Sequence, residues 1–421
     1  MTSLPNLMVP ANPSGETVVF GGVDTHAATH TVAAVSQHGA SLGHATFPAD
    51  PAGYHNLVAW LGRLGEIARV AVEGTGSYGA GLTEYCRRAG VEVFEVSRPS
   101  RRTRRGTGKS DPVDAENAAR AALAGADLSV PKSRDGYVES LRVIQQTRRG
   151  AVQARTAALN TMHQLILTAP ADLRVQLDRL SGAAQVEACA GLRPGPDLDD
   201  PAQATKTALR RLARRISNLD AEIDQADTDL DTLTRRHRPN LVAEVGVGPI
   251  TAAQLLITAG DNPDRMASPA AFVALCGANP IPASSGQTVR HRLNRGGDRQ
   301  ANSALHTIAV TRLRCHPETQ AYAATLKARG KTSRDIRRCL KRYLARHLYH
   351  LIAQPAAHVE TNTTRSSSSA ASPPPQKRWP GEAPRPWGRP WPARNTAPDG
   401  RRGSGVNGGR RPSRQRSRSD P

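Results

Sequence analysis

The segment TVVFGGVDTHAATHTVAAVSQHGASLGHATF, residues 17–47, decides the fold of the N-terminal part of the chain. Its three runs are rich in β-branched and apolar residues, and polar or glycine-containing stretches separate them, a pattern that predicts β-strands. We expect strands over residues 17–23, 30–36 and 41–47, and Asp24 follows the first strand directly. The segment therefore predicts a three-stranded meander.

Alternating helices and strands follow this meander. The expected elements are a helix over 51–64, a strand over 69–72 that ends at Glu73, a helix over 78–89 and a strand over 91–96. The resulting order, βββαβαβ, is typical of RNase H-like domains, although many other α/β proteins begin in the same way. We predict an α/β RNase H-like domain over residues 17–130.

The region over residues 137–237 has the periodicity of long helices. We expect one helix over 137–167 and another over 203–237. The second helix carries apolar residues in steps of three and four: Leu209, Leu212, Ile216, Leu219, Ile223, Ala226, Leu230 and Leu233. More than three such heptads predict a coiled coil that needs an apolar partner, either the 138–167 helix or a second subunit. An ordinary amphipathic bundle helix explains the periodicity equally well.

The C-terminal third of the chain changes character near residue 355. Residues 241–350 predict a mainly α-helical domain that ends in a basic helix over 335–350. Residues 355–421 are rich in Ser, Pro, Gly and Arg and lack periodicity, so we predict a disordered basic tail. The tail either binds nucleic acid through its charge or is dispensable.

The charge balance points to a polyanionic partner. Lys and Arg number 57 against 36 Asp and Glu in 421 residues, which gives a formal net charge of +21. Residues 365–421 hold 13 Lys or Arg and three acids, so this segment contributes +10 and the rest of the chain +11. Such an excess favours nucleic acid or a membrane surface over a small neutral substrate. No segment approaches the roughly 18 apolar residues of a membrane span, and no secretory signal is evident, so we expect a cytoplasmic protein.

Four acidic residues occupy positions where active sites are commonly built. Asp24 and Glu73 follow predicted strands, and Asp111 and Asp114 lie three residues apart at the start of an Ala-rich helix. Helix capping by Asp111 explains the second pair on local grounds alone. Together, however, four carboxylates suit two Mg²⁺ ions about 4 Å apart, the arrangement that cleaves or exchanges phosphodiesters. We therefore predict a site for two Mg²⁺ ions held by these four acids.

A run of cations precedes the second acidic pair. Its members are Arg98, Arg101, Arg102, Arg104, Arg105 and Lys109. Six cations without an intervening acid favour a loop that binds a nucleic-acid backbone, and a solvated charged loop is the alternative.

These motifs resemble those of a known family. The N-terminal motifs are GVDTH (22–26), VEGTG (72–76) and GKSDPVDA (108–115), and the C-terminal motifs are VGVGPITA (245–252), FVALCG (272–277), SSG (284–286) and RGGDR (295–299). In this order they resemble the RuvC-like DEDD domain and the C-terminal domain of bacterial insertion-sequence transposases of the IS-one-ten family. The resemblance covers about residues 17 to 350 and includes the coiled coil that joins the two domains.

The resemblance implies a mechanism as well as a fold. It implies that Asp24, Glu73, Asp111 and Asp114 bind Mg²⁺ and that a serine of the C-terminal domain attacks the DNA. It also implies a covalent DNA–protein intermediate, strand exchange guided by an RNA from the element, and a nucleoid-associated enzyme in a bacterium. The basic tail and the doubled serine depart from the family pattern.

The serine loop is identified by this resemblance more than by its own chemistry. Ser284 and Ser285 lie in a loop bounded by Pro and Gly, and such a loop is ordinary when taken alone. Cations that suit phosphate follow it: Arg290, Arg292, Arg295 and Arg299. We predict Ser285 as the nucleophile because it directly precedes Gly286, with Ser284 as the alternative. We set His26 and His30 aside as surface or packing residues, since Mg²⁺ prefers oxygen ligands.

Together these features predict a transposase or site-specific DNA recombinase. Its expected partners are DNA, a guide RNA and further copies of the chain, which would form a dimer or tetramer through the coiled coil. The first alternative is a RuvC-like junction nuclease in which water attacks the phosphodiester. The second is a non-catalytic nucleic-acid-binding remnant of an element.

Overall fold

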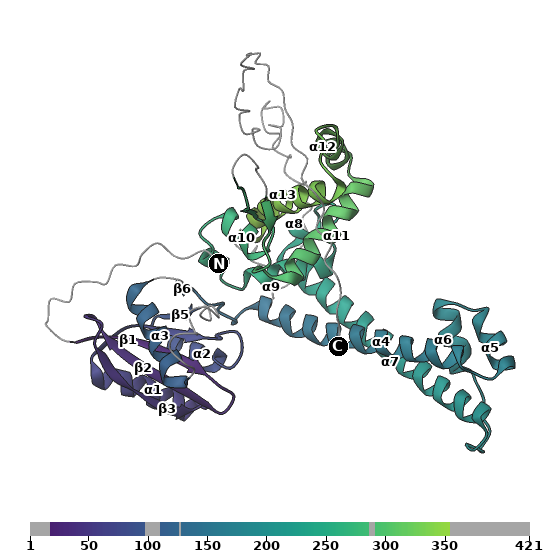
Figure 1. Ribbon diagram of the computed structural model, residues 1–421, viewed down its shortest axis with the longest axis horizontal. Coiled ribbons are helices and arrows are strands. Elements are labelled where there is room, and N and C mark those ends of the chain that lie inside the picture. Colours follow the sequence, from purple (N-terminus) through teal and green to yellow (C-terminus); the bar gives the residue numbers. More distant parts are fainter. Residues whose placement is uncertain (1–16, 97–109, 126–127, 286–290, 354–421) are drawn as a thin grey trace, which may run out of the picture. The chain divides into compact units, whose positions relative to one another are not determined.

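A computed structural model of the chain describes residues 17–96, 110–125, 128–285 and 291–353 (Figure 1). Two predictions lie outside these residues: the cation run from Arg98 to Lys109 and the basic tail. Arg290 lies outside them as well. No helix in the described ranges is long and apolar enough to cross a membrane.

The N-terminal part is built on a mixed six-stranded sheet. Its strands are β1 (Val18–Thr25), β2 (Thr29–Ser36), β3 (Ser41–Pro48), β4 (Glu66–Glu73), β5 (Val93–Val96) and β6 (Leu128–Ser129), in the spatial order β3-β2-β1-β4-β5-β6. β1, β4 and β5 are parallel, whereas β2, β3 and β6 pair antiparallel with their neighbours. Every residue of β1 is buried, as expected of a central strand covered on both faces. This architecture is consistent with the predicted RNase H-like domain.

Three helices cover the two faces of this sheet. They are α1 (Pro51–Leu64), α2 (Ala80–Arg88) and α3 (Asp111–Ala124). Val19 and Val23 of β1 share a hydrophobic cluster with residues of α1 and α2. Val18 and Phe20 share another cluster with alanines of α3. Because successive side chains of a strand point to opposite faces, even-numbered residues of β1 face α3.

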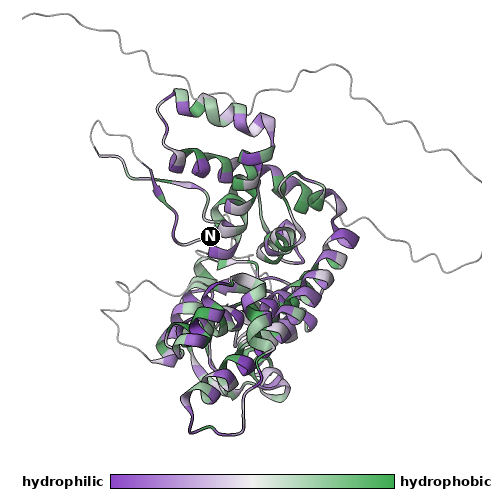
Figure 2. Ribbon diagram, turned by 90° about the vertical axis from the view of Figure 1, so that its right-hand side faces the viewer, coloured by the Kyte–Doolittle hydropathy of each residue, from purple (hydrophilic) through white to green (hydrophobic). Residues whose placement is uncertain are grey.

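Two long helices form an antiparallel pair in the middle of the sequence. α4 (Tyr137–Leu167) and α7 (Pro201–His237) pack along each other, and α5 (Ala171–Asp178) and α6 (Gly182–Ala190) pack near one end of the pair (Figure 1). Arg148 of α4 pairs with Asp227 of α7, and Arg155 pairs with Asp220. The apolar seam of α7 therefore has a partner within the chain. Figure 2 shows that the helices of the molecule carry both hydrophobic and hydrophilic residues.

The C-terminal part is mainly helical, as predicted, and contains one hairpin that was not predicted. Its elements are α8 (Pro239–Val242), α9 (Pro249–Ala259), the 3₁₀ helix η2 (Pro263–Arg265), α10 (Pro269–Leu275), β7 (Pro280–Pro282), β8 (His291–Leu293), α11 (Arg299–Cys315), α12 (Pro317–Ala328) and α13 (Ser333–Ala353). Phe272, Leu305 and Leu348 are fully buried in its core. The strands β7 and β8 pair antiparallel.

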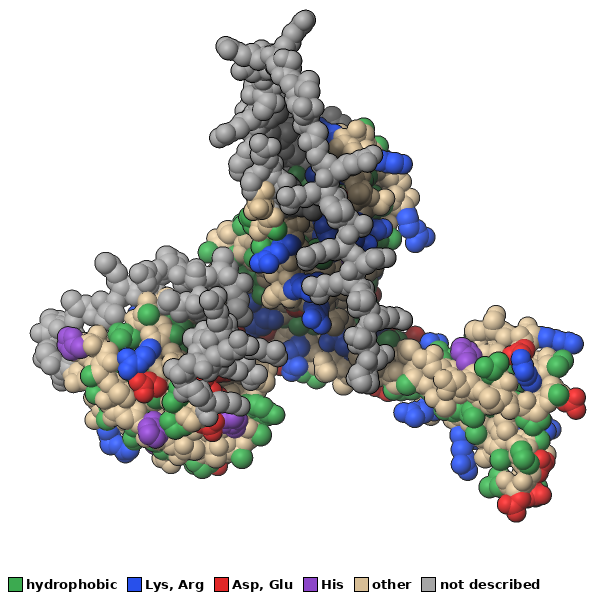
Figure 3. Space-filling model, in the orientation of Figure 1, with side chains coloured by type: hydrophobic (Ala, Val, Ile, Leu, Met, Phe, Trp, Pro, Cys, Tyr) green, Lys and Arg blue, Asp and Glu red, His purple; other side chains and the backbone are tan. Residues whose placement is uncertain are grey.

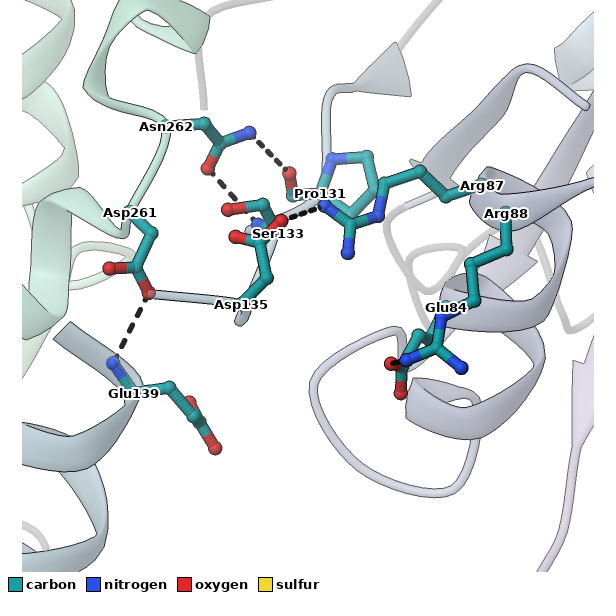
Figure 4. A network of polar contacts seen from close by, with 9 residues as sticks. All are labelled: Glu84, Arg87, Arg88, Pro131, Ser133, Asp135, Glu139, Asp261 and Asn262. Atoms are coloured by element: carbon teal, nitrogen blue, oxygen red, sulfur yellow. Dashed lines mark hydrogen bonds and ion pairs between the residues drawn. The ribbon is translucent and has the colours of Figure 1, made fainter. Parts of the chain in front are cut away.

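A polar network fixes the start of α4 to the turn after α9 (Figure 4). The two carboxylate oxygens of Asp261 accept hydrogen bonds from the Val138 and Glu139 amides, at 2.8 and 3.2 Å. Asn262 accepts from the Ser133 amide at 3.1 Å and donates to the Pro131 carbonyl at 3.0 Å. α4 begins after a glycine that offers no capping side chain, so Asp261 serves as its cap from a distant part of the sequence.

Candidate active site

Asp24 lies near the end of β1 on the face that α3 covers. Its side chain is 12% exposed. The same face holds Gly22, where a Cβ atom would lie 2.0 Å from the Ala119 amide nitrogen and 2.2 Å from the Ala115 carbonyl oxygen. Only glycine allows the backbone of α3 to come this close to β1. The close approach brings the start of α3 to the end of β1, where Asp24 lies.

α3 carries the second acidic pair in its first turn. Asp111 is the first residue of the helix, and Ser110 occupies the capping position. Within the described residues, the Asp111 carboxylate makes no hydrogen bond to the helix backbone. Asp111 is therefore not used as a helix cap in this structure. The exposed fraction of its side chain, 49%, leaves the carboxylate accessible to a ligand.

His26 connects the two acidic elements. Its Nε2 atom lies 3.2 Å from Asp24 Oδ2 and 3.4 Å from Asp111 Oδ1. Ligand atoms of Asp24, His26 and Asp111 all lie within 4.8 Å of one another, a geometry that could hold a metal ion. Sequence reasoning missed this contact when it set His26 aside. The available signal was its position two residues after Asp24.

His30, in contrast, is a packing residue as expected. Its ring is buried and stacks on Tyr54 with a centroid separation of 5.6 Å. Burial lowers the pKa of His30 below its ordinary value and favours the neutral imidazole.

The electrostatics of Asp24 indicate crowded negative charge. Burial raises the pKa of its carboxyl above the ordinary value. The neighbouring imidazole of His26 opposes this shift, and the charges of Asp111 and Asp114 add to it. All three carboxylates therefore interact at short range. A divalent cation would offset their mutual repulsion and favour the ionised forms.

Glu73 is the last residue of β4, the parallel neighbour of β1. The register of β1 and β4 pairs Val23 with Val72, so Asp24 and Glu73 lie at the ends of adjacent strands. Ala71 packs in the cluster on the α3 face, and alternation places Glu73 on that face too. The Thr25 hydroxyl donates to the Glu73 carbonyl at 2.8 Å and ties the two strand ends together. Asp114 raises the pKa of Asp24 through its charge, but neither Glu73 nor Asp114 belongs to the 4.8 Å group.

The donor set fits a hard divalent cation. Carboxylate oxygens are the preferred ligands of Mg²⁺ and Mn²⁺, and an added imidazole nitrogen suits transition metals. The arrangement is a candidate metal site formed by β1, its following turn and α3. Its individual ligands remain predictions.

The predicted nucleophile belongs to the hairpin of β7 and β8. Ser284 and Ser285 follow β7, and both are exposed. Arg292, Arg295 and Arg299 are exposed as well, in and after β8. In the described part of the chain, Ser285 makes no hydrogen bond to any of the four predicted acids. A site that combines both groups stays a prediction.

The base of this hairpin is tightly built. A Cβ atom at Gly297 would lie 2.2 Å from the Gly277 amide nitrogen, so the two loops that carry β7 and β8 touch through glycines. Asn294 donates to the Ala274 carbonyl at 3.1 Å and to the Asn279 side chain at 2.7 Å. These contacts fix the base of the hairpin that carries the exposed Ser284 and Ser285.

A mixed sheet that is consistent with an RNase H-like domain, with acids gathered where β1 ends and α3 begins, is typical of enzymes that break or exchange phosphodiesters with bound metal. Comparison with known families agrees with this class. Residues 21–169 match the DEDD domain of IS110 elements, described as "Transposase", and residues 241–324 match "Transposase IS116/IS110/IS902 family". The chain belongs to the IS110 family of transposases, as the resemblance predicted. It is therefore an enzyme of DNA transposition.

Two relatives from insertion elements are similar to this chain. The "Insertion element IS900 uncharacterized 42 kDa protein" of Mycobacterium paratuberculosis is 23% identical over 394 residues, which cover 82% of this chain and 98% of that protein. The "Insertion element IS110 uncharacterized 43.6 kDa protein" of Streptomyces coelicolor is 32% identical over 109 residues, which cover 25% of this chain and 27% of that protein. The first similarity extends over both matched domains.

Proposed function

We propose that this transposase excises and integrates its element by attack of Ser285 on a DNA phosphodiester, assisted by Mg²⁺ and guided by an RNA of the element. The observation that carries the proposal is the juxtaposition of Asp24 and Asp111, which β1 and α3 bring to the same His26 nitrogen. The exposed position of Ser285 supports the choice of nucleophile. The family membership supports DNA as the substrate.

The chain's own residues divide the work between two domains. Asp24, Glu73, Asp111 and Asp114 would hold two cations at the site of phosphodiester cleavage. Bound Mg²⁺ supplies charge neutralisation and lowers the pKa of an attacking hydroxyl. The Ser285 Oγ–P bond forms as the P–O bond to the departing strand breaks; the hydroxyl proton of Ser285 passes to solvent water, and the departing oxygen takes up a proton from solvent. Exposed Arg292, Arg295 and Arg299 hold neighbouring phosphates.

Trapping the covalent intermediate tests this proposal. Wild-type protein is incubated with labelled element-end DNA, Mg²⁺ and RNA that co-purifies with it, and is then denatured and resolved on a gel. We expect a DNA–protein adduct that disappears in Ser285→Ala and in Asp111→Asn. Ser284→Ala is the matched control and should keep most of the adduct. Loss in Ser284→Ala alone would move the nucleophile by one residue, and an adduct in the double variant would refute serine attack from this loop.

A junction nuclease is the second candidate function. The acidic cluster lies entirely within the N-terminal domain and would suffice for attack by water. In that case four-way DNA junctions would be cut without an adduct, and Ser285→Ala would cut as fast as the wild type. A non-catalytic remnant would bind DNA and yield neither product.

Self-association and the guide RNA belong to the same proposal. Exchange between two DNA sites requires more than one active site, and α7 offers a surface for a second copy. Leu219 and Ile223 in the middle of α7 are half-buried and belong to none of the hydrophobic clusters, although α4 covers other apolar residues of α7.

Sequencing of RNA that co-purifies with the protein tests the proposed guide RNA. A reproducible RNA encoded beside the transposase gene is the expected result.

A further inference from the structure

α13 is a strongly basic helix whose charge the proposed mechanism does not use. Over residues 333–353 it carries six Lys or Arg and one acid, Asp335. Ile336 and Leu340 pack the face away from these cations into the core, and Leu348 is buried two turns farther along the helix. Figure 3 shows Lys and Arg side chains over the region of the C-terminal helices. Such a helix is held in place by packing, so its cations project from a rigid support.

Four of these cations form a ridge, which we define as Arg334, Arg337, Arg338 and Lys341. Their spacing of three and four residues places them on one side of the helix. Arg338 pairs with Asp335 at 3.3 Å, whereas Arg334 and Arg337 pair with no acid among the described residues. Seven residues at 1.5 Å each give the ridge a length of about 10 Å, or roughly three nucleotide steps of 3.4 Å.

Lys341 is partly desolvated at the end of this ridge. Burial lowers the pKa of Lys341, and the charges of Arg338 and Arg337 lower it further. Its ammonium donates to the neutral Asn302 side chain at 2.6 Å, and Lys341 forms no ion pair with an acid in the described part of the chain. Cations that repel one another on a rigid helix gain most from an anion bound between them.

Asn302 connects the ridge to the serine hairpin. Its amide donates to the Cys276 and Gly277 carbonyls, at 2.9 and 3.0 Å. Gly277 is the residue that touches Gly297 at the base of the hairpin. Lys341 is therefore one side chain away from the loops that carry β7 and β8.

We infer that the ridge binds the sugar-phosphate backbone of the DNA strand that the hairpin attacks. The inference deepens the proposed function and depends on it for the identity of the substrate strand. The ridge neutralises consecutive phosphates and positions the strand next to the base of the hairpin. We assign the bound backbone to DNA because the ridge lies beside the loop that carries the proposed nucleophile. An RNA duplex has the same backbone charge, so the experiment includes it as a separate probe.

The test compares two double variants of the full-length protein that remove the same charge from one helix. Arg334→Ala/Arg337→Ala changes the ridge, and Arg342→Ala/Arg346→Ala changes two exposed cations farther along the helix, beyond the end of the ridge. Fluorescence anisotropy measures binding of labelled duplex DNA and of duplex RNA of equal length at several salt concentrations. Loss of two phosphate contacts lowers the slope of log affinity against log salt concentration on DNA by about 1.8. The ratio of wild-type affinity to variant affinity therefore falls about tenfold as salt rises from 50 to 200 mM.

We expect this change for the ridge variant on DNA and a clearly smaller one for the control pair. Arg334→Lys/Arg337→Lys retains the charge and should retain the slope, which separates phosphate binding from misfolding. Equal slopes for the two Ala pairs, or a larger loss on RNA than on DNA, would overturn the inference. Adduct formation by wild type is scored separately: its absence would refute serine attack while the binding comparison still decides the ridge.

Discussion

The contact between α3 and β1 at Gly22 makes the sharpest prediction for the acidic site. In Gly22→Ala the new methyl group would meet the Ala119 nitrogen at 2.0 Å and the Ala115 oxygen at 2.2 Å. Both atoms belong to the backbone, so no side-chain rotation relieves the clash and α3 must move away from the sheet. Overpacking costs about 1–3 kcal/mol, and we expect the upper end of this range. Movement of α3 also separates Asp111 from Asp24.

Two measurements check this prediction. Urea unfolding followed by circular dichroism gives the free energy of unfolding, and Mn²⁺ titration followed by electron paramagnetic resonance gives the metal affinity. We expect a loss of roughly 3 kcal/mol and a 10–100-fold weaker Mn²⁺ affinity, the range found when a metal site loses its supporting contacts. Gly62→Ala in α1 is the matched control, since a Cβ atom there meets nothing within 4 Å.

Gly62→Ala should leave the metal affinity unchanged and stabilise the fold by about 0.4–1 kcal/mol, because alanine restricts the unfolded chain. If Gly22→Ala has the same free energy of unfolding and the same Mn²⁺ affinity as the wild type, the close packing of α3 does not position the site. The reasoning from Gly22 to Asp111 would then be wrong.

Three further predictions concern other parts of the chain. Burial lowers the pKa of Lys132 to about 8, so the folded state loses this proton at a lower pH than the unfolded state does. The free energy of unfolding of the wild type, measured in urea, should therefore rise relative to that of Lys132→Met as pH rises from about 8 to 10.5. Asp261→Ala should cost about 1–2 kcal/mol by removing the cap of α4, whereas exposed Asp264→Ala should cost almost nothing. Leu219→Asp combined with Ile223→Asp should lower the mass in light scattering, and an unchanged mass would exclude this surface from self-association.

Local sequence signals were sufficient for several of the regular elements. The predicted bounds of α1, 51–64, are confirmed, and the structure shows Asp50 capping this helix through the Gly53 amide at 2.8 Å. The bounds of α4, 137–167, are confirmed as well. β4 begins at Glu66, earlier than predicted, because pairing with the start of β1 extends a strand whose own first residues are only weakly apolar.

Tertiary contacts account for what the sequence did not reveal. β6 has two residues and exists because Leu128 and Ser129 pair with β5. The partner of α7 was left open, since a seam of apolar residues does not identify the surface that covers it. His26 became a candidate ligand only when packing of α3 brought Asp111 to it. The same limit applied to Lys341, whose contact with Asn302 joins residues 39 positions apart.

The measurement closest to the central claim is mass spectrometry of the trapped adduct after protease and nuclease digestion. The account predicts a nucleotide remnant attached through phosphate to the Oγ of Ser285, present with Mg²⁺ and absent with EDTA. Asp24→Asn should abolish the modified peptide while the protein still binds DNA. Strand exchange without any modified serine, or modification of a residue outside the hairpin loop, would contradict the account.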